Sequence, residues 1–223
     1  RYQEDFGSDE IAYLVYRVPG NANGPFDLSA MHKISRLTQA LERDVPFVRE
    51  VTSLTNVEFM QAQEDFLEIT ELGQDMPASQ DDLLAHGAAM RKKPIYEDAL
   101  ISRDGAHGGI ILEMSATSSD PLESIRLDLA KGDSLDNLYP QASQARILEI
   151  LNRPEYDGIE FWWSGDVPLN AAYNQTTNDS SGLLTLLSIA LVAVITMICF
   201  RGQLLGLFGP LSVVLVSLIL TVG

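Results

Sequence analysis

Cysteine and histidine are scarce in this chain of 223 residues, which holds one cysteine and three histidines. A single cysteine, Cys199, excludes an intramolecular disulfide, and inside an apolar stretch it is expected to pack as a small hydrophobic side chain. The histidines are isolated, and none stands at metal-ligand spacing from another histidine or from the cysteine. The sequence also lacks a nucleophile elbow, a Walker loop and a dinucleotide-binding glycine motif. We therefore expect no enzyme activity, no catalytic residue, no cofactor and no metal site.

Charge is almost absent from the C-terminal part of the chain. Between residues 183 and 223 the only charged side chain is that of Arg201, whereas all 31 acidic residues lie within residues 1–182. Such a strongly acidic region repels phosphate groups, so we expect no nucleic-acid partner. Its aromatic and β-branched side chains favour a folded domain over intrinsic disorder.

Two long apolar runs follow this acidic region. Residues 183–200 form 18 consecutive positions without a charge, and residues 204–222 form another 19. At about 1.5 Å per residue, each helix would be roughly 27–28 Å long, which is close to the thickness of a bilayer's hydrocarbon core, about 30 Å. The sequence therefore predicts a transmembrane hairpin, with helices at residues 183–200 and 204–223 and a cytoplasmic turn at residues 201–203. The second helix is interrupted by Gly209 and Pro210, which predict a kink.

Arg201 sets the expected orientation, because short loops that carry Lys or Arg stay in the cytoplasm. Residues 1–182 then lie on the periplasmic or extracellular side of the cytoplasmic (plasma) membrane. A kinked membrane helix needs neighbouring helices to cover its freed carbonyl group, which favours a bundle of several spans. The chain also starts without a methionine and stops inside an apolar run, so we expect a fragment of a longer integral membrane protein.

Apolar periodicity predicts an α+β domain at residues 1–165 and a connecting polar helix at residues 166–182. The expected architecture is built of β-α-β units, with a mixed sheet covered by helices on one face. Residues 56–78 are ambiguous, and a loose helix is expected within them at residues 57–72. The remaining strands are expected at residues 11–18, 47–54 and 159–164, and a β-hairpin pairs residues 99–102 with 109–116. Helices are expected at residues 28–42, 81–92 and 141–152. Asp27 caps the first of these helices and Ser79 the second.

Trp162 and Trp163 are adjacent on an expected strand, so their side chains point to opposite sides of the sheet. One of them is expected in the core. The other is a candidate for lining an apolar substrate path or for contacting a partner. These two residues are the only substrate-path candidates in the sequence, whereas Arg201, Gly209 and Pro210 are candidates for topology and helix shape.

Several short segments, in their order, resemble the first extracytoplasmic domain and the second and third transmembrane helices of resistance-nodulation-division (RND) transporters, in the MmpL-like exporter branch. The segments that carry the likeness are FGSDE at 6–10, VTSL at 51–54, ISRDG at 101–105, SGDVP at 164–168, FRG at 200–202 and LTVG at 220–223. The likeness implies a porter-type outer domain and a further helix before residue 1.

The resemblance implies a segment of a membrane exporter driven by protons or another ion gradient, with lipids or other hydrophobic molecules as substrates. Its partners would be the lipid bilayer, the remaining transmembrane helices and the second half of the same transporter. The family's proton-relay acids lie outside this sequence. The related Patched-like and sterol-sensing branch suggests an alternative, a receptor or sensor whose outer domain binds a ligand without moving it. A third alternative is an accessory protein anchored by the hairpin.

Overall fold

The computed structural model describes residues 10–62, 67–115, 141–199, 212 and 216. The chain forms two compact units, residues 1–171 and residues 172–223. The first unit contains two sheets with their helices. The long helix α5, Asp166–Cys199, begins in the first unit and continues into the second.

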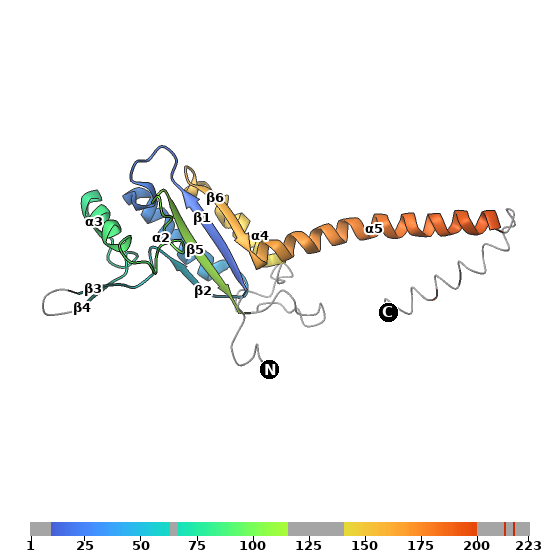
Figure 1. Ribbon diagram of the computed structural model, residues 1–223, viewed down its shortest axis with the longest axis horizontal. Coiled ribbons are helices and arrows are strands. Elements are labelled where there is room, and N and C mark those ends of the chain that lie inside the picture. The colour runs from blue at the N-terminus through green and yellow to red at the C-terminus, as the bar shows by residue number, and fades with distance from the viewer. Residues whose placement is uncertain (1–9, 63–66, 116–140, 200–211, 213–215, 217–223) are drawn as a thin grey trace. The chain divides into compact units, whose positions relative to one another are not determined.

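The main sheet has four strands in the order β2-β5-β1-β6, and every neighbouring pair is antiparallel. Its strands are β1 (Ile11–Arg17), β2 (Val48–Ser53), β5 (His107–Met114) and β6 (Glu160–Gly165) (Figure 1). Helix α2 (Leu28–Asp44) joins β1 to β2, and helix α4 (Gln141–Leu151) lies between β5 and β6 along the chain. Two β-α-β units therefore interleave, and this is the split β-α-β topology of ferredoxin-like folds.

The expected mixed sheet is wrong for the described strands. Strands β1 and β2 run in the same direction, but β5 lies between them; β1 in turn separates β5 from β6. Interleaving thus places an antiparallel strand between each parallel pair, so no two parallel strands are neighbours. The strand-helix-strand elements themselves agree with the sequence prediction, and so does the position of helices over one face.

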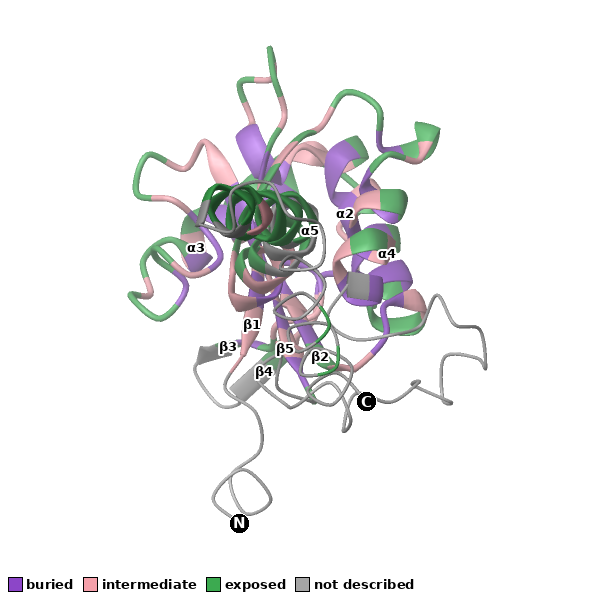
Figure 2. Cartoon of the chain, turned by 90° about the vertical axis from the view of Figure 1, so that its right-hand side faces the viewer, coloured by how far each residue is buried: buried purple, intermediate pink, exposed green. Residues whose placement is uncertain are grey.

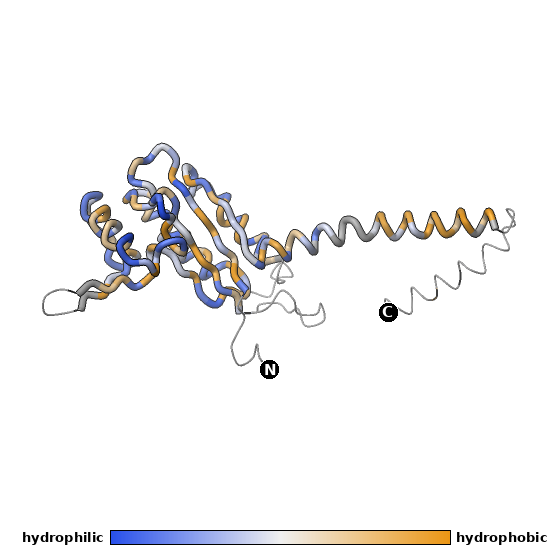
Figure 3. Tube along the Cα trace, viewed as in Figure 1, coloured by the Kyte–Doolittle hydropathy of each residue, from blue (hydrophilic) through white to orange (hydrophobic). Residues whose placement is uncertain are grey.

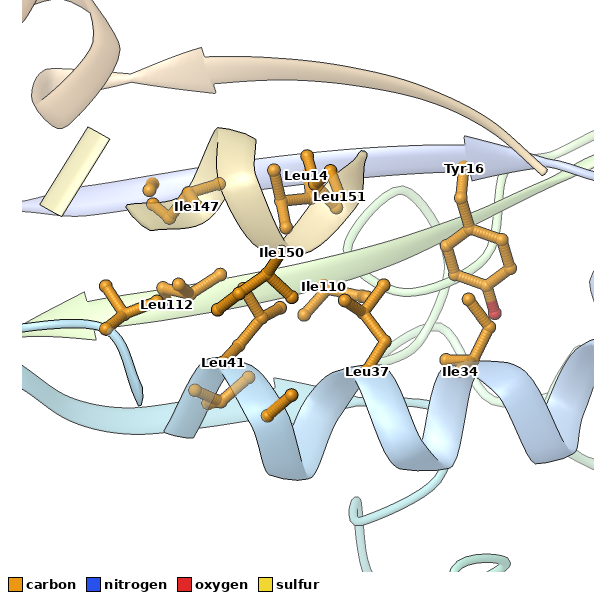
Figure 4. Packing of buried hydrophobic residues seen from close by; sticks show 14 of the residues in the cluster. Leu14, Tyr16, Ile34, Leu37, Leu41, Ile110, Leu112, Ile147, Ile150 and Leu151 are labelled. Carbon is orange, nitrogen blue, oxygen red and sulfur yellow. The ribbon is translucent and has the colours of Figure 1, made fainter. Parts of the chain in front are cut away.

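Helices α2 and α4 cover one face of the sheet (Figure 2). Helix α2 begins where the Asp27 side chain accepts a hydrogen bond of 2.8 Å from the Ala30 amide, as the capping pattern predicts. Strand β1 alternates buried and partly exposed residues because one of its sides faces these helices. Figure 4 shows the resulting core, whose labelled members come from both helices and both central strands: Leu14, Tyr16, Ile34, Leu37, Leu41, Ile110, Leu112, Ile147, Ile150 and Leu151.

An insertion between β2 and β5 forms a second core. It contains the hairpin β3 (Phe59–Ala62) and β4 (Leu67–Thr70), followed by helix α3 (Gln80–Met90), which starts at the expected cap Ser79. The loose helix expected at residues 57–72 is therefore wrong. The apolar residues there fit both a helical and an alternating period, and cross-strand pairing selects the hairpin. The second core is formed by Phe26, Met31, Leu54, Phe59, Leu72, Leu83, Met90, Tyr96, Leu100 and Ile101.

The β-hairpin predicted around residues 103–105 is present only in part. The Ser102 amide donates to the His107 carbonyl, and Ile101 forms one isolated antiparallel bridge with Gly108. Residues 99–102 do not form a strand, because β5 pairs along most of its length with β1 and β2.

The predicted transmembrane hairpin is also corrected. Within the part of the chain that the structure describes, no helix combines the length and the apolar character needed to cross a membrane. Helix α5, Asp166–Cys199, joins the predicted connecting helix and the described part of the first predicted membrane helix in one continuous helix. The second helix of the predicted hairpin, residues 204–223, lies outside the described residues apart from Ser212 and Val216.

Candidate functional site

Strand β6 carries both tryptophans of the chain and lies at the edge of the main sheet. Trp163 is opposite Leu14 and therefore shares the helix-covered side, whereas Trp162 is opposite Val15 on the other side. The expectation that one of the two is a core residue is wrong, since 49% of Trp162 and 42% of Trp163 is exposed. An edge strand has a neighbour on one side only, so even an inward-pointing side chain stays accessible. We call these two residues the tryptophan edge.

The Trp162 ring has an aromatic neighbour on β5. The ring centroids of Trp162 and His107 are 6.2 Å apart in an edge-to-face arrangement. His107 Nδ1 lies 3.8 Å from Asp104 Oδ1, and the Asp104 carboxylate accepts hydrogen bonds from Ser102 Oγ and the Ala106 amide. These hydrogen bonds hold the pKa of Asp104 below its usual range. No sequence pattern indicates this neighbour, because Trp162 and His107 are distant along the chain.

Tyr13 lies on the same side of the sheet as Trp162. Its hydroxyl donates a 2.8 Å hydrogen bond to the Ala99 carbonyl, which ties β1 to the segment before β5. Partial burial raises the pKa of Tyr13, and the nearby Asp98 carboxylate raises it further. The tyrosine is therefore a neutral hydrogen-bond donor, and it adds an aromatic side chain to the side of the sheet that carries Trp162.

The second apolar surface belongs to α5. Figure 3 shows that the helix changes from hydrophilic to hydrophobic along its length. Eleven large apolar side chains in its C-terminal half are exposed, by 41% to 72% each. They are Leu183, Leu184, Leu186, Leu187, Ile189, Leu191, Val192, Val194, Ile195, Met197 and Ile198. Exposed apolar surface of this extent marks a site of interaction with another apolar surface.

The described residues contain no group of three or more His, Cys, Asp or Glu side chains that could hold a metal ion. Of the three histidines, His107 is the first residue of β5, His32 lies on α2 and His86 lies on α3. The remaining candidates from the sequence, Arg201, Gly209 and Pro210, lie outside the described residues.

Comparison with known proteins adds no assignment: no protein-family model matches the chain, and no curated protein matches its sequence.

Proposed function

We propose that this chain is a segment of a membrane transporter of the RND type, an exporter whose acidic α+β domain lies outside the cytoplasmic membrane. The transported molecules are lipids or other hydrophobic compounds, and an ion gradient, such as that of protons, drives their movement. Two features support the proposal: the ordered segments that resemble this family, and the apolar surface of α5.

The exposed apolar half of α5 is the observation that carries the proposal. Complete burial of a Leu, Ile, Val or Met side chain is worth about 1.5–3 kcal/mol. Eleven such side chains, exposed by 41% to 72%, therefore favour an apolar environment strongly. Lipid and the apolar helices of the same transporter are the proposed partners of this surface.

A vesicle-binding experiment tests this association with the membrane. The purified chain is mixed with neutral phosphatidylcholine vesicles, and the bound fraction is measured by flotation. Leu187 is 55% exposed in the apolar half of α5, and Leu169 is 68% exposed in its polar half. We expect Leu187→Asn to weaken binding about tenfold, since the lost apolar contact is worth at least about 1.4 kcal/mol. The matched variant Leu169→Asn should bind like the wild type. Equal binding by all three proteins would contradict the proposed role of α5.

We also propose that the tryptophan edge contacts the hydrophobic substrate. Both tryptophans of the chain lie there, so intrinsic fluorescence reports on this strand alone. A brominated fatty acid quenches tryptophan on contact, and we expect saturable quenching of the wild type. Trp162 lies on the same side of the sheet as Val15, next to His107. The Trp162→Phe variant should therefore lose the quenching by fatty acid bound on that side and keep the quenching of Trp163. Unsaturable quenching would indicate random collisions and would exclude a binding site.

Transport itself is tested in the full-length protein. Movement of a labelled lipid across reconstituted vesicles should stop when a protonophore or another ionophore collapses the gradient. Binding of the lipid without any movement would instead identify a receptor of the Patched-like kind.

A further inference from the structure

A small pocket lies where the end of α3 meets the segment before β5. Its volume is about 110 Å³, and it is lined by Arg91, Glu97, Ile101, Ser102 and Arg103. This volume is ample for several water molecules or for one small ion with four oxygen atoms. Two guanidinium groups at one pocket are unexpected in a chain with a net charge of −16.

Arg91 supplies the available positive charge. Its guanidinium lies against the turn at Gly105, where an added Cβ atom would be 2.6 Å from Cζ of Arg91. Gly105 has a φ of +70°, a conformation that glycine adopts without strain. The glycine therefore leaves space for the guanidinium to approach the backbone closely. No hydrogen bond or ion pair joins the Arg91 side chain to another described residue, so no described residue engages its five N–H donors.

Arg103 is the second cation and is already held in place. Its Nε and Nη2 atoms donate to Asp98 Oδ2 at 2.9 and 2.6 Å, and its Nε lies 3.5 Å from Glu97 Oε1. These two carboxylates compensate much of its charge. Ser102 Oγ is also engaged, because it donates to Asp104 and accepts from the His107 amide. Recognition by this pocket thus depends on Arg91, with Arg103 as a fixed neighbour.

We propose that this pocket binds a phosphate group. A planar guanidinium presents pairs of N–H donors that match the spacing of phosphate oxygens. The carboxylate of Glu97, which also lines the pocket, opposes an anion and weakens its binding without abolishing it. The phosphate could belong to a free ion or to the headgroup of a lipid; the chemistry of the contact is the same.

Isothermal titration of the purified chain with inorganic phosphate tests the proposal. We expect Arg91→Ala to weaken binding at least tenfold. Glu97→Gln removes the opposing charge and should tighten binding several-fold. Lys92→Ala is the matched control, because it removes one positive charge next to Arg91 from a side chain that does not line the pocket. Far-ultraviolet circular dichroism confirms that each variant is folded.

Loss of binding in Arg91→Ala together with near wild-type binding in Lys92→Ala supports the site. Equal weakening by both substitutions shows that only overall charge matters and overturns it, and so does absence of phosphate binding by the wild type. A second arm compares vesicles that contain phosphatidic acid with vesicles of phosphatidylcholine alone. If the preference for phosphatidic acid disappears in Arg91→Ala, the natural source is a lipid headgroup. If it persists while binding of inorganic phosphate is lost, the source is a free phosphate.

Discussion

In the main core, the ring of Tyr16 packs directly against Gly108, so adding a single methyl group at Gly108 tests this contact. The two residues are directly opposite each other on β1 and β5. Tyr16 is fully buried, and a Cβ atom added at Gly108 would lie 2.2 Å from its Cζ, 2.4 Å from its Oη and 2.5 Å from its Cε1. Gly108 is not among the glycines with a positive φ, so its backbone would tolerate alanine. The tyrosine ring alone therefore requires glycine at this position.

We expect Gly108→Ala to lower the free energy of unfolding by about 2–3 kcal/mol, the upper part of the range for an overpacked core. For a chain of this size, that loss lowers the Tm by roughly 4–12 °C. Tryptophan fluorescence during urea and thermal unfolding measures the change, because the tryptophan edge lies on β6, which pairs with β1.

A double-mutant cycle with Tyr16→Leu isolates the contact. In the Tyr16→Leu background the ring is absent, so Gly108→Ala should change the unfolding free energy by less than about 0.5 kcal/mol. Gly182→Ala serves as the control, since a Cβ atom there meets nothing within 4 Å and should not destabilise the protein. If Gly108→Ala destabilises both backgrounds equally, the ring is not the cause and this reasoning is refuted.

Substitutions at three further positions test other parts of the first unit. Ser53→Ala removes a buried hydroxyl that accepts hydrogen bonds from Thr38 Oγ1 at 2.9 Å and from the Thr55 amide at 3.1 Å. We expect urea unfolding to show that the free energy of unfolding falls by about 1–3 kcal/mol. An unchanged midpoint would mean that this network contributes nothing to stability. Burial raises the pKa of Tyr156 from 10.0 to about 12, so its contribution to stability is complete below pH 10 and is lost as the pH rises towards 12. Tyr156→Phe should therefore lose less stability than the wild type across that interval in urea titrations, and parallel losses would contradict the assignment. Asp27→Ala should cost about 1 kcal/mol through loss of the N-cap, whereas Asp27→Ser should retain most of the stability in the same assay.

Local signals in the sequence were sufficient for most of the elements. Asp27 and Ser79 mark the starts of α2 and α3, and apolar spacing marks α2, α4 and the strands of the main sheet. The pairing of the strands was not predictable in the same way, because it is decided by contacts between distant parts of the chain. Residues 57–72 were misjudged for a related reason: only the partner strand distinguishes an alternating apolar pattern from a short helical one.

The candidate site was predicted less well than the fold. The sequence identified Trp162 and Trp163 as notable, and alternation placed them on opposite sides of the sheet. Their exposure depends on β6 being an edge strand, which follows from the order of the whole sheet and from nothing local to β6. The contact between Trp162 and His107 depends on β5 and β6 both flanking β1, so no sequence pattern could have indicated it.

The proposed phosphate pocket shows how the insertion gives the first unit a feature that the four-stranded sheet alone does not have. Leu83 and Met90 of α3 are buried in the second core, which fixes the end of that helix and therefore the position of Arg91. Asp98 has a φ of 62°, a conformation that aspartate tolerates better than most residues, and its carboxylate holds Arg103. The backbone that carries Arg91 is thus positioned by packing, and the Arg103 side chain by its hydrogen bonds. Because Arg103 is already held, binding of an anion needs to order only the Arg91 side chain, and this lower ordering cost favours binding.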